Sequence, residues 1–540
     1  MIGVLATLWW SVAQATPTPP DALYFVLVDR FADGRQDPAH PVDPTDPQAW
    51  HGGDLAGLLA HYDEIPGGGL WLSPIQAART EPIGKWGAFH GYWTTDLHAL
   101  EPRLATDAEL MALSKRLDDD GKELWLDLVT NHVGYDAPLI AEKPDWFHHN
   151  GDITDWNDSV EVVTHDVHGL PDLAVEKPEV YAHILGAATH WVKVANPTGF
   201  RVDAVRHLPE GFLAKLRADL RKVDPELQLL GEFFEGDPEK LAARQRVDQL
   251  DRVFDFPLHY ALKDAMCGGD LGRLAAVIGQ DDAYDDPSSL VTFLDNHDVA
   301  RIRSVCGGDV DRVARTLAVL TTVRGTPCIT WGTEAGLDGA EEPANRADMV
   351  FEPQPLRASL DALLDLRTTH EALGREAPTR VLAVDRQRVV LARRAKGQTA
   401  ALVVTGDAST TWPLAELGSD CRGWVVTDAR GPRPLPAVGA LPVPPSAVGI
   451  AVCGGEPSGA VARAFGPEQP AVPVRLEVPD DKVLVGSGER LGRWDPGKGL
   501  SQSTALQVPP GTVLQYKLVG RDGDAWVWPD GGNMVRLVPW

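Results

Sequence analysis

The chain contains 540 residues with a formal net charge of −27, and 44% of its residues are hydrophobic. One hydrophobic core stops growing at roughly 250–300 residues, so we expect roughly two to four domains. The charge argues against nucleic acid or an anionic membrane as a partner, because both bind basic patches. The composition excludes disorder on a large scale.

The N-terminal segment has the features of an export signal. Residues 2–12 form an apolar run that is too short to span a bilayer. The run ends in Ala13-Gln14-Ala15, the small-x-small pattern of a signal-peptidase site, although no Lys or Arg precedes it. We therefore expect residues 1–15 to be a signal peptide and the protein to be secreted.

Eight short apolar runs follow, separated by segments that can form helices. They are Leu23–Val28, Gly69–Leu72, Leu124–Val129, Gly199–Val202, Leu227–Leu230, Arg252–Phe256, Val291–Leu294 and Thr326–Trp331. Each has the character of a fully buried parallel strand. Eight such strands alternating with helices predict an α/β fold, a (β/α)8 TIM barrel, over residues 16–375.

The segments between the runs support this interpretation. Thr106 and Glu109 form a capping box that opens a helix running towards Asp120, and residues 313–323 and 359–369 have helical spacing. Residues 134–173 break the alternation after the third strand and are too long for a structureless loop. We expect them to form a small inserted subdomain.

The pattern changes beyond the barrel. Short strands separated by turn residues predict an antiparallel β domain over residues 376–453. Residues 454–473 are rich in Gly, Pro and Ala, which is typical of a linker. Residues 474–540 contain four tryptophans and short strands, and we expect a small β-sandwich module.

Five cysteines are present, without a CxxC motif, so the sequence supports neither a zinc site nor a redox motif. In an exported protein, Cys421 with Cys453 and Cys267 with Cys306 are plausible disulfides. Cys328 lies in an apolar run and is expected to be a buried thiol. Sequence alone does not fix these pairings.

Polar residues follow four of the predicted strands, at the barrel face where active sites lie. They are Asn131 and His132 after the third strand, Arg201, Asp203, Arg206 and His207 in and after the fourth, Glu232 after the fifth, and His297 and Asp298 after the seventh. One Asp at a strand end is usually a cap or a turn residue. Four such segments in strand order predict a single site.

These segments resemble the signature regions of the α-amylase family, glycoside hydrolase family 13, over roughly residues 23–346. The resemblance implies that Asp203 is the nucleophile, Glu232 the general acid/base and Asp298 the stabiliser of the transition state. A retaining glycosidase needs two such carboxyls roughly 5–5.5 Å apart. Arg201 lies on the same strand face as Asp203 and would keep it ionised, while Phe233 and Phe234 would raise the pKa of Glu232.

The resemblance also implies a set of sugar-binding residues. Tyr92 would stack on a sugar ring, and His132 and His297 would donate hydrogen bonds to hydroxyls. Where the family usually has Asp in an outer sugar-binding loop, this chain has Glu342. The full set in the barrel is His90, Tyr92, Trp93, His132, Arg201, Arg206, His207, His297 and Arg346.

A calcium ion ties the inserted subdomain to the barrel in this family. By resemblance its ligands are Asn131, Asp172 and the backbone oxygen of His207, and oxygen donors from distant segments suit Ca²⁺. The alternative is that Asn131 and Asp172 cap turns. A second site of related bacterial enzymes would use Asp33 and Asp54, but Arg35 stands where those enzymes often have a ligand.

The last unit resembles a starch-binding module of carbohydrate-binding module family 20. Trp494, Lys517, Trp528 and Asn533 carry the match. The two indoles would stack on glucose rings, and the two polar side chains would bind hydroxyls. Tryptophans in a small β unit are more often core residues, and this remains the alternative.

The resemblance implies a hydrolase that cleaves α-1,4-glucosidic bonds in starch and maltooligosaccharides, with Ca²⁺ bound. We expect a monomer, although the sequence does not determine the oligomeric state. One alternative is a transglycosylase like cyclodextrin glucanotransferase. That group has a Tyr or Phe at the centre of the cleft, where this chain has His168, which favours hydrolysis. A second alternative, a non-catalytic carbohydrate-binding protein, is disfavoured because all three carboxyls are present.

Overall fold

The computed structural model describes residues 21–36, 39–523 and 525–540, so the expected signal peptide, residues 1–15, lies outside the described residues. Eight parallel strands close into a barrel in the order β1-β10-β9-β8-β7-β6-β5-β2. They are β1 (Leu23–Val26), β2 (Gly69–Leu72), β5 (Glu123–Leu128), β6 (Gly199–Val202), β7 (Gln228–Gly231), β8 (Arg252–Phe254), β9 (Leu290–Phe293) and β10 (Thr326–Thr330). Each falls on one of the eight predicted runs, and the predicted barrel is confirmed.

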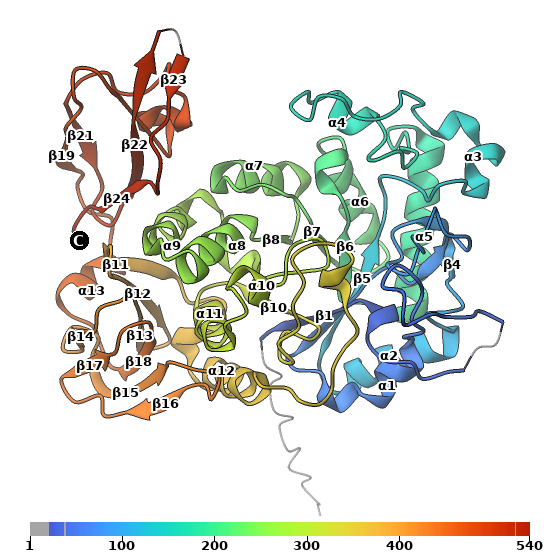
Figure 1. Ribbon diagram of the computed structural model, residues 1–540, viewed down its shortest axis with the longest axis horizontal. Helices are drawn as coiled ribbons and strands as arrows, with labels where there is room; N and C mark the ends of the chain where they lie inside the picture. Colours follow the sequence, from blue (N-terminus) through green and yellow to red (C-terminus); the bar gives the residue numbers. More distant parts are fainter. Residues whose placement is uncertain (1–20, 37–38, 524) are drawn as a thin grey trace, which may run out of the picture.

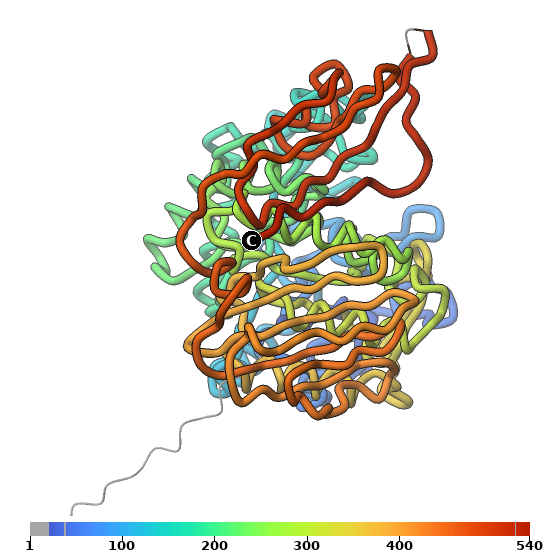
Figure 2. Tube along the Cα trace, turned by 90° about the vertical axis from the view of Figure 1, so that its left-hand side faces the viewer, coloured from blue at the N-terminus to red at the C-terminus, as the bar shows by residue number. Residues whose placement is uncertain are grey.

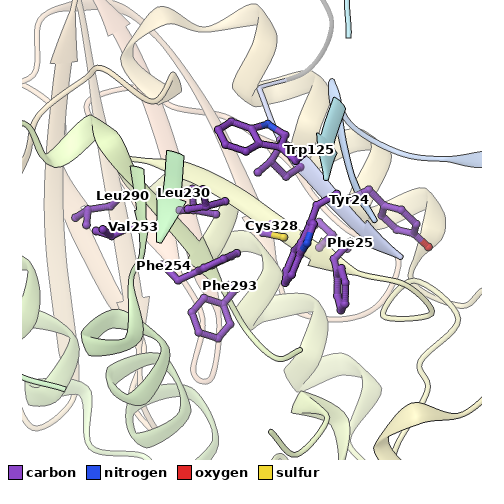
Figure 3. Close-up of a cluster of buried hydrophobic side chains, with 14 of the residues drawn as sticks. Tyr24, Phe25, Trp125, Leu230, Val253, Phe254, Leu290, Phe293 and Cys328 are labelled. Carbon is purple, nitrogen blue, oxygen red and sulfur yellow. The ribbon is translucent and has the colours of Figure 1, made fainter. Parts of the chain in front are cut away.

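Aromatic and aliphatic side chains fill the inside of the barrel. Phe25 on β1 stacks on Trp71 on β2, with ring centroids 3.8 Å apart. Figure 3 shows further buried side chains of this core, including Phe254 and Phe293, whose rings meet edge to face at 5.7 Å. Burial of these large apolar faces provides the main driving force for closing the barrel.

Helices surround the strands (Figure 1). The capping box of Thr106 and Glu109 is present and opens the second of them, as predicted. The helices are α1 (Leu55–Ala60), α2 (Asp107–Asp119), α5 (Pro178–Ala195), α6 (Phe212–Leu220), α7 (Pro238–Asp248), α8 (Phe256–Leu262), α9 (Leu271–Ile278), α10 (Ile302–Val305), α11 (Val310–Thr322) and α12 (Arg357–Thr369). No helix in the described part of the chain is long and apolar enough to cross a membrane.

Residues 134–173 follow β5 and hold only two short α-helices, α3 (Pro138–Glu142) and α4 (Glu161–Thr164). Next to them, β3 (Gln76–Ala78) pairs antiparallel with β4 (Thr94–Leu100). Figure 1 shows α3 and α4 together at one end of the molecule, away from the C-terminal sheets.

The C-terminal third is antiparallel β structure, as predicted. A six-stranded sheet has the order β11-β12-β13-β18-β15-β16, and β14 pairs with β17. The strands are β11 (Thr379–Asp385), β12 (Arg388–Ala395), β13 (Gln398–Thr405), β14 (Thr410–Pro413), β15 (Ser419–Val426), β16 (Arg433–Leu435), β17 (Ala440–Val443) and β18 (Val448–Gly454). Arg393 attaches the sheet to the barrel, since its Nη1 donates to the carbonyl oxygen of Thr322 at 3.0 Å.

The predicted linker over residues 454–473 is wrong in its central part. Residues 459–464 form the helix α13 (Gly459–Ala464), and Val461 is buried in a small core beneath the sheet. Three alanines favour a helix, and the apolar surface of Val461 and Phe465 anchors it, so the low-complexity composition did not produce an extended segment.

The last unit packs directly on the barrel and the sheet. Its strands are β19 (Val472–Leu476), β20 (Val483–Gly486), β21 (Thr504–Val508), β22 (Val513–Asp522), β23 (Ala525–Val527) and β24 (Met534–Leu537). Val513 is part of the main core, and Val535 packs against α9. Figure 2 shows this unit directly above the six-stranded sheet. It is therefore a docked part of the molecule rather than a freely hinged one.

The cysteine predictions are confirmed. Cys267 is bonded to Cys306, and Cys421 is bonded to Cys453. Cys328 is a buried free thiol on β10, among the described residues. The second disulfide lies within the sheet domain, where it joins β15 to β18.

Candidate active site

A cavity of about 730 Å³ opens at the carboxyl ends of the barrel strands. The structure brings nearly all the predicted barrel residues to it. Its lining includes His90, Tyr92, Trp93, His132, Asp203, Arg206, His207, Glu232, His297, Asp298 and Arg346. Arg201 lies beneath the floor and is fully buried.

The three carboxyl-bearing residues occupy the ends of different strands. Asp203 is one residue beyond β6, Glu232 directly follows β7, and Asp298 lies in the loop after β9. Ala204, the residue after Asp203, adopts a left-handed backbone conformation with φ of 51°. This turn directs its N–H to Glu232 Oε2 at 3.2 Å, so the backbone after β6 positions the Glu232 carboxyl.

One guanidinium holds the floor of the site together. Arg201 Nη1 donates to Asp203 Oδ1 at 2.8 Å and to both oxygens of Asp127 at 3.0 Å. Its Nη2 contacts Glu232 Oε1. Asp203 and Glu232 therefore contact the two terminal nitrogens of the same planar group, which holds their carboxyls side by side.

The two carboxyls beside this guanidinium are not equivalent. Burial raises the pKa of Glu232 to about 8; the charge of Arg201 opposes the shift, and that of Asp203 adds to it. Glu232 is thus protonated at neutral pH, while Asp203 accepts a charge-assisted hydrogen bond from Arg201. A protonated acid next to a carboxylate is the pair that a glycosidase requires.

Asp298 lies close to positively charged guanidinium groups. Burial alone would raise its pKa, but the positive charges of Arg346 and Arg201 hold the pKa below its usual range. Arg346 Nη2 donates to Asp298 Oδ1 at 3.2 Å. Asp298 is therefore a carboxylate at neutral pH and is able to stabilise positive charge on a bound ring.

The histidines of the cavity are neutral hydrogen-bonding groups. Burial lowers the pKa values of His90, His132 and His297, the last to about 3. His297 stacks face to face with Tyr92, with ring centroids 5.0 Å apart. His132 Nε2 donates to the Tyr92 carbonyl oxygen at 3.2 Å. The Trp93 ring meets His90 edge to face, which keeps the loop after β2 packed.

The inserted segment and the loop after β7 contribute an aromatic wall to the cavity that the sequence did not predict, since Phe234 was expected only as an apolar neighbour of Glu232. Trp156 lines the cavity with 39% of its surface exposed, and Phe234 does so with 38% exposed. Arg206 Nη2 fixes this wall by donating to the Trp156 carbonyl oxygen at 2.7 Å, and His168 lies 5.7 Å from the indole. The sequence signal that could have identified Trp156 is its position in the long insertion after a strand whose end contributes residues to the site.

Glu342 also reaches the cavity. It forms an ion pair with Arg346, which in turn contacts Asp298. The Glu that replaces the family's usual Asp is thus paired with the guanidinium that contacts Asp298, while its own side chain stays 43% exposed.

The predicted calcium ligands converge. One end of the Asn131 side-chain amide lies 2.8 Å from the His207 carbonyl oxygen and 3.3 Å from Asp172 Oδ1. Two arrangements fit these distances. In one, the Asn131 amide nitrogen donates to the His207 carbonyl oxygen and to Asp172 Oδ1. In the other, the Asn131 amide oxygen faces these two oxygens and a cation lies among the three oxygen atoms. No group of three or more His, Cys, Asp or Glu side chains in the described chain is arranged to hold a metal. An amide, a carbonyl and a carboxylate form an all-oxygen donor set that fits Ca²⁺.

The second calcium position is occupied by a side chain of the protein. Arg35 Nε donates to Asp54 Oδ2 at 3.1 Å and forms an ion pair with Glu109 at 3.3 Å. Asp54 Oδ1 caps α1 by accepting from the Gly57 N–H at 2.7 Å. The guanidinium already supplies the positive charge that a second calcium would bring.

The predicted sugar-binding residues of the last unit lie on its surface. Trp528 is 43% exposed, and Trp494 is half-buried at the end of a short 3₁₀ helix, Glu489–Trp494. Lys517 Nζ donates to the Pro529 carbonyl oxygen at 3.2 Å, which places it beside Trp528, and Asn533 is half-buried just before β24.

Comparisons with known proteins agree with this geometry. The family model "Alpha amylase, catalytic domain" matches residues 25–364. The β/α-amylase of Paenibacillus polymyxa is 32% identical over 402 residues, covering 68% of this chain and 32% of that protein. A cyclomaltodextrinase of Geobacillus thermopakistaniensis is 28% identical over 447 residues, covering 76% of this chain and 72% of that protein.

Among solved structures, the α-amylase of Geobacillus thermoleovorans complexed with acarbose superposes with a TM-score of 0.71 at 29% identity. The match covers 80% of this chain and 98% of that one. The chain spans only about a third of the length of the P. polymyxa relative.

A closed barrel with three carboxyl groups in one cavity at its strand ends defines a glycoside hydrolase. The chain belongs to the α-amylase family. The expectation of an enzyme is confirmed, and the alternative of a non-catalytic carbohydrate-binding protein is wrong.

Proposed function

We propose that this enzyme is secreted, acts as a monomer and hydrolyses α-1,4-glucosidic bonds in starch and maltooligosaccharides with retention of anomeric configuration. The observation that carries the proposal is the shared guanidinium of Arg201, which binds Asp203 and contacts Glu232 at its two terminal nitrogens. Carboxyls held this close leave no room for a water molecule between nucleophile and sugar, which favours the retaining route.

In the first step, Asp203 attacks the anomeric carbon while Glu232 gives its proton to the leaving oxygen. In the second step, Glu232 takes a proton from water, and this water displaces Asp203 from the sugar. Asp298 stabilises the positive charge that develops on the ring in both transition states. The neutral His132 gives its one N–H to the Tyr92 carbonyl oxygen and so positions Tyr92, which stacks against the ring. The neutral His297 donates a hydrogen bond to a sugar hydroxyl.

The test is product analysis on soluble starch, with the anomer of the first products read by NMR. We expect short maltooligosaccharides that appear initially as the α-anomer. Initial β-anomers would contradict the assignment of Asp203 as nucleophile. Absence of any soluble product from starch would contradict the substrate.

A second candidate is transfer to a sugar acceptor, or action on cyclic glucans. It is supported by the large exposed ring of Trp156 beside His168 in the cavity and by the similarity to a cyclomaltodextrinase. The same reaction mixtures discriminate the two candidates, because transfer yields products longer than the starting oligosaccharide and hydrolysis yields only shorter ones.

Calcium binding by Asn131, Asp172 and the His207 carbonyl forms part of the proposal. These residues would hold the ion between the inserted segment and the barrel, where it would supply charge that fixes the cavity wall. A ligand at roughly 100 times its Kd stabilises the folded state by about 2.7 kcal/mol. We therefore expect chelation to lower the melting temperature and added Ca²⁺ to restore it.

The matched variants for this prediction are Asp172→Asn and Asp33→Asn. Asp172→Asn should abolish the calcium-dependent shift in melting temperature, whereas Asp33→Asn, in the segment where Arg35 supplies the cation, should retain it. A melting curve that chelation leaves unchanged, with no metal by elemental analysis, would rule the site out.

Starch binding by the last unit is proposed from Trp494, Lys517, Trp528 and Asn533. Because this unit is docked, the full chain is the proper material. We expect Trp494→Ala and Trp528→Ala each to weaken adsorption to starch granules roughly tenfold, since each removes a stacking face. Activity on short soluble oligosaccharides should stay unchanged, because the barrel holds the proposed catalytic groups.

Trp526→Ala is the control for granule binding, since the guanidinium of Arg521 covers that ring at 4.5 Å. It should adsorb like the wild type. Equal adsorption by all four proteins would show that the tryptophans serve only as structure.

A further inference from the structure

The short helix α10 directly follows the loop that carries Asp298. The two ends of this loop are joined by a hydrogen bond, because the Ile302 N–H donates to Asp295 Oδ2 at 2.7 Å. Both residues are buried, each with 2% of its surface exposed. Figure 1 shows α10 next to α11. The position of α10 therefore fixes both ends of the loop with Asp298.

The loop after β10 is bound to the same segment. Arg301, the residue before α10, donates its backbone N–H to the Gly339 carbonyl oxygen at 2.9 Å. The Gly339 N–H in turn donates to Ser304 Oγ at 2.7 Å. The buried Nε of Arg301 donates to the Asn345 carbonyl oxygen at 2.8 Å. One segment thus holds the middle and the end of this second loop, which leads to Arg346.

The two loops meet at Asp298. Arg346 Nε donates to the His297 carbonyl oxygen at 2.9 Å, and its Nη2 donates to Asp298 Oδ1 at 3.2 Å. The side-chain amide of Asn345 donates to the same His297 carbonyl oxygen at 2.9 Å. A shift of α10 would therefore displace both Asp298 and the guanidinium that contacts its carboxylate.

A covalent bond anchors the C-terminal end of α10. The helix has four residues, and a helix of about one turn is not stable by itself. Cys306, the residue after α10, is joined to Cys267 by a disulfide. Cys267 ends the π-helical turn Lys263–Cys267, which continues α8, and its carbonyl oxygen accepts from Arg312 Nη1 on α11 at 3.1 Å. The disulfide thus joins α10 to two helices of the barrel.

The chain beyond the disulfide is a weaker attachment. Gly307 and Gly308 follow Cys306 with φ of +68° and +81°, and a Cβ at either would meet nothing within 4 Å. Two glycines in open space leave the backbone free to change conformation. Asp309 then caps α11 by accepting the Arg312 N–H at 2.9 Å. The disulfide, rather than this link, therefore fixes α10 to the barrel.

We propose that the Cys267–Cys306 disulfide is a positioning element of the active site, which fixes α10 and, through α10, Asp298 and Arg346. Neither cysteine lines the active-site cavity, so both are positioning residues. The inference rests on the proposed function, since Asp298 acts on a transition state only if the chain cleaves a glycosidic bond. It goes beyond that function because it assigns part of the turnover to a covalent bond outside the cavity.

The test compares Cys267→Ser/Cys306→Ser with Cys421→Ser/Cys453→Ser on a maltooligosaccharide, at a temperature where both variants stay folded. The first should lose roughly 10- to 100-fold in kcat, since a misplacement of about 1 Å costs up to 10²-fold. Its KM should change less than about twofold, because Asp298 acts mainly in the transition state. The second should keep wild-type kcat, because its disulfide joins two strands of the sheet domain, which contributes no residue to the cavity lining in the described chain. Wild-type kcat in the first variant, or an equal loss in both, would overturn the inference.

Reduction of the folded protein is a second measurement, which does not require folding without the bond. In Cys421→Ser/Cys453→Ser, dithiothreitol gives two electrons and two protons to the one remaining disulfide, which becomes two thiols, and the reagent closes to its cyclic disulfide. Cys267 is half-buried and precedes the exposed Gly268, so the reagent can reach it. We expect kcat to fall and hydrogen exchange of residues 295–305 to quicken. Unchanged kcat after full reduction would overturn the inference. A wild type without activity on maltooligosaccharides would overturn the proposed function, and the inference would fall with it.

Discussion

Asp203→Asn and Glu232→Gln will each leave a folded protein that has lost several orders of magnitude in turnover. For Glu232→Gln the expected loss is roughly 10²–10⁴-fold, the range that one general acid contributes. Both substitutions keep the size of the side chain and remove only its ability to carry charge or to give a proton. Steady-state rates on a maltooligosaccharide, beside thermal melts, measure the effect.

A substrate whose leaving group needs no proton separates the two roles. Fluoride leaves a glycosyl fluoride without acid assistance, so Glu232→Gln should still form the bond between Asp203 and the sugar. It should then release a burst of about one equivalent of fluoride and stall, because no base activates water. Asp203→Asn should give no burst. A burst from Asp203→Asn would reverse the assignment.

The pH dependence supplies an independent check on Glu232. Its pKa of about 8 in the folded protein means that the proton needed for catalysis is lost above that pH, so kcat/KM should fall on the alkaline side. A carboxyl whose pKa is raised on folding stabilises the fold less as pH rises from its unfolded value to its folded value. Glu232→Gln should therefore gain stability relative to the wild type between about pH 4.5 and pH 8.

Glu235→Gln is the control for both measurements. Glu235 lies three residues further along and accepts the Asp237 N–H at 2.9 Å, outside the cavity lining. It should keep wild-type turnover and wild-type stability. If Glu235→Gln lost turnover and gained stability as Glu232→Gln does, both effects would come from a change in the loop after β7 and not from loss of the Glu232 acid.

The barrel could be predicted because its strands are short, apolar on both faces and separated by helical segments. Such runs as Gly69–Leu72 and Gly199–Val202 have few other places in a soluble fold. The position of the site followed from the same rule, because parallel strands bring Asp203, Glu232 and Asp298 to one end of the barrel.

What sequence reasoning missed depends on contacts between distant segments. Trp156 lies in an insertion without periodicity, so nothing local shows that its ring faces the cavity. The helix at residues 459–464 was hidden by a composition that resembles a linker, because tertiary burial of Val461 decides its structure. The docking of the last unit through Val513 also required knowledge of the surface of α9.

Arg201→Met will lower the free energy of unfolding by about 3–5 kcal/mol, the usual effect of leaving buried charges without their partner. The guanidinium is fully buried, holds Asp127 and Asp203, and lies 5.1 Å from the Trp71 ring centroid. Turnover should also fall roughly 10²–10³-fold, as when a fixed charged donor is removed from an active site. Arg201→Lys should recover little, because one ammonium cannot span two carboxyls as a planar fork does.

The stability loss in Arg201→Met should depend on pH in a definite direction. Burial raises the pKa of Asp127 to about 7 and that of Glu232 to about 8, so at pH 8.5 more of these carboxyls are ionised than at pH 5. The unpaired negative charge left by the substitution is thus larger at pH 8.5, and the loss measured by denaturant unfolding should be larger there. An equal loss at both pH values would show that Arg201 acts by packing alone.

Arg324→Met separates structural from catalytic effects. Arg324 is equally buried and pairs with Asp255 and Asp281, outside the lining of the active-site cavity. It should be destabilised to a similar degree but keep wild-type kcat at a temperature where it stays folded. If Arg324→Met lost turnover as Arg201→Met does, the activity loss would follow from general destabilisation. If Arg324→Met keeps its turnover and Arg201→Met loses it, Arg201 is the residue that positions the carboxyls of Asp203 and Glu232.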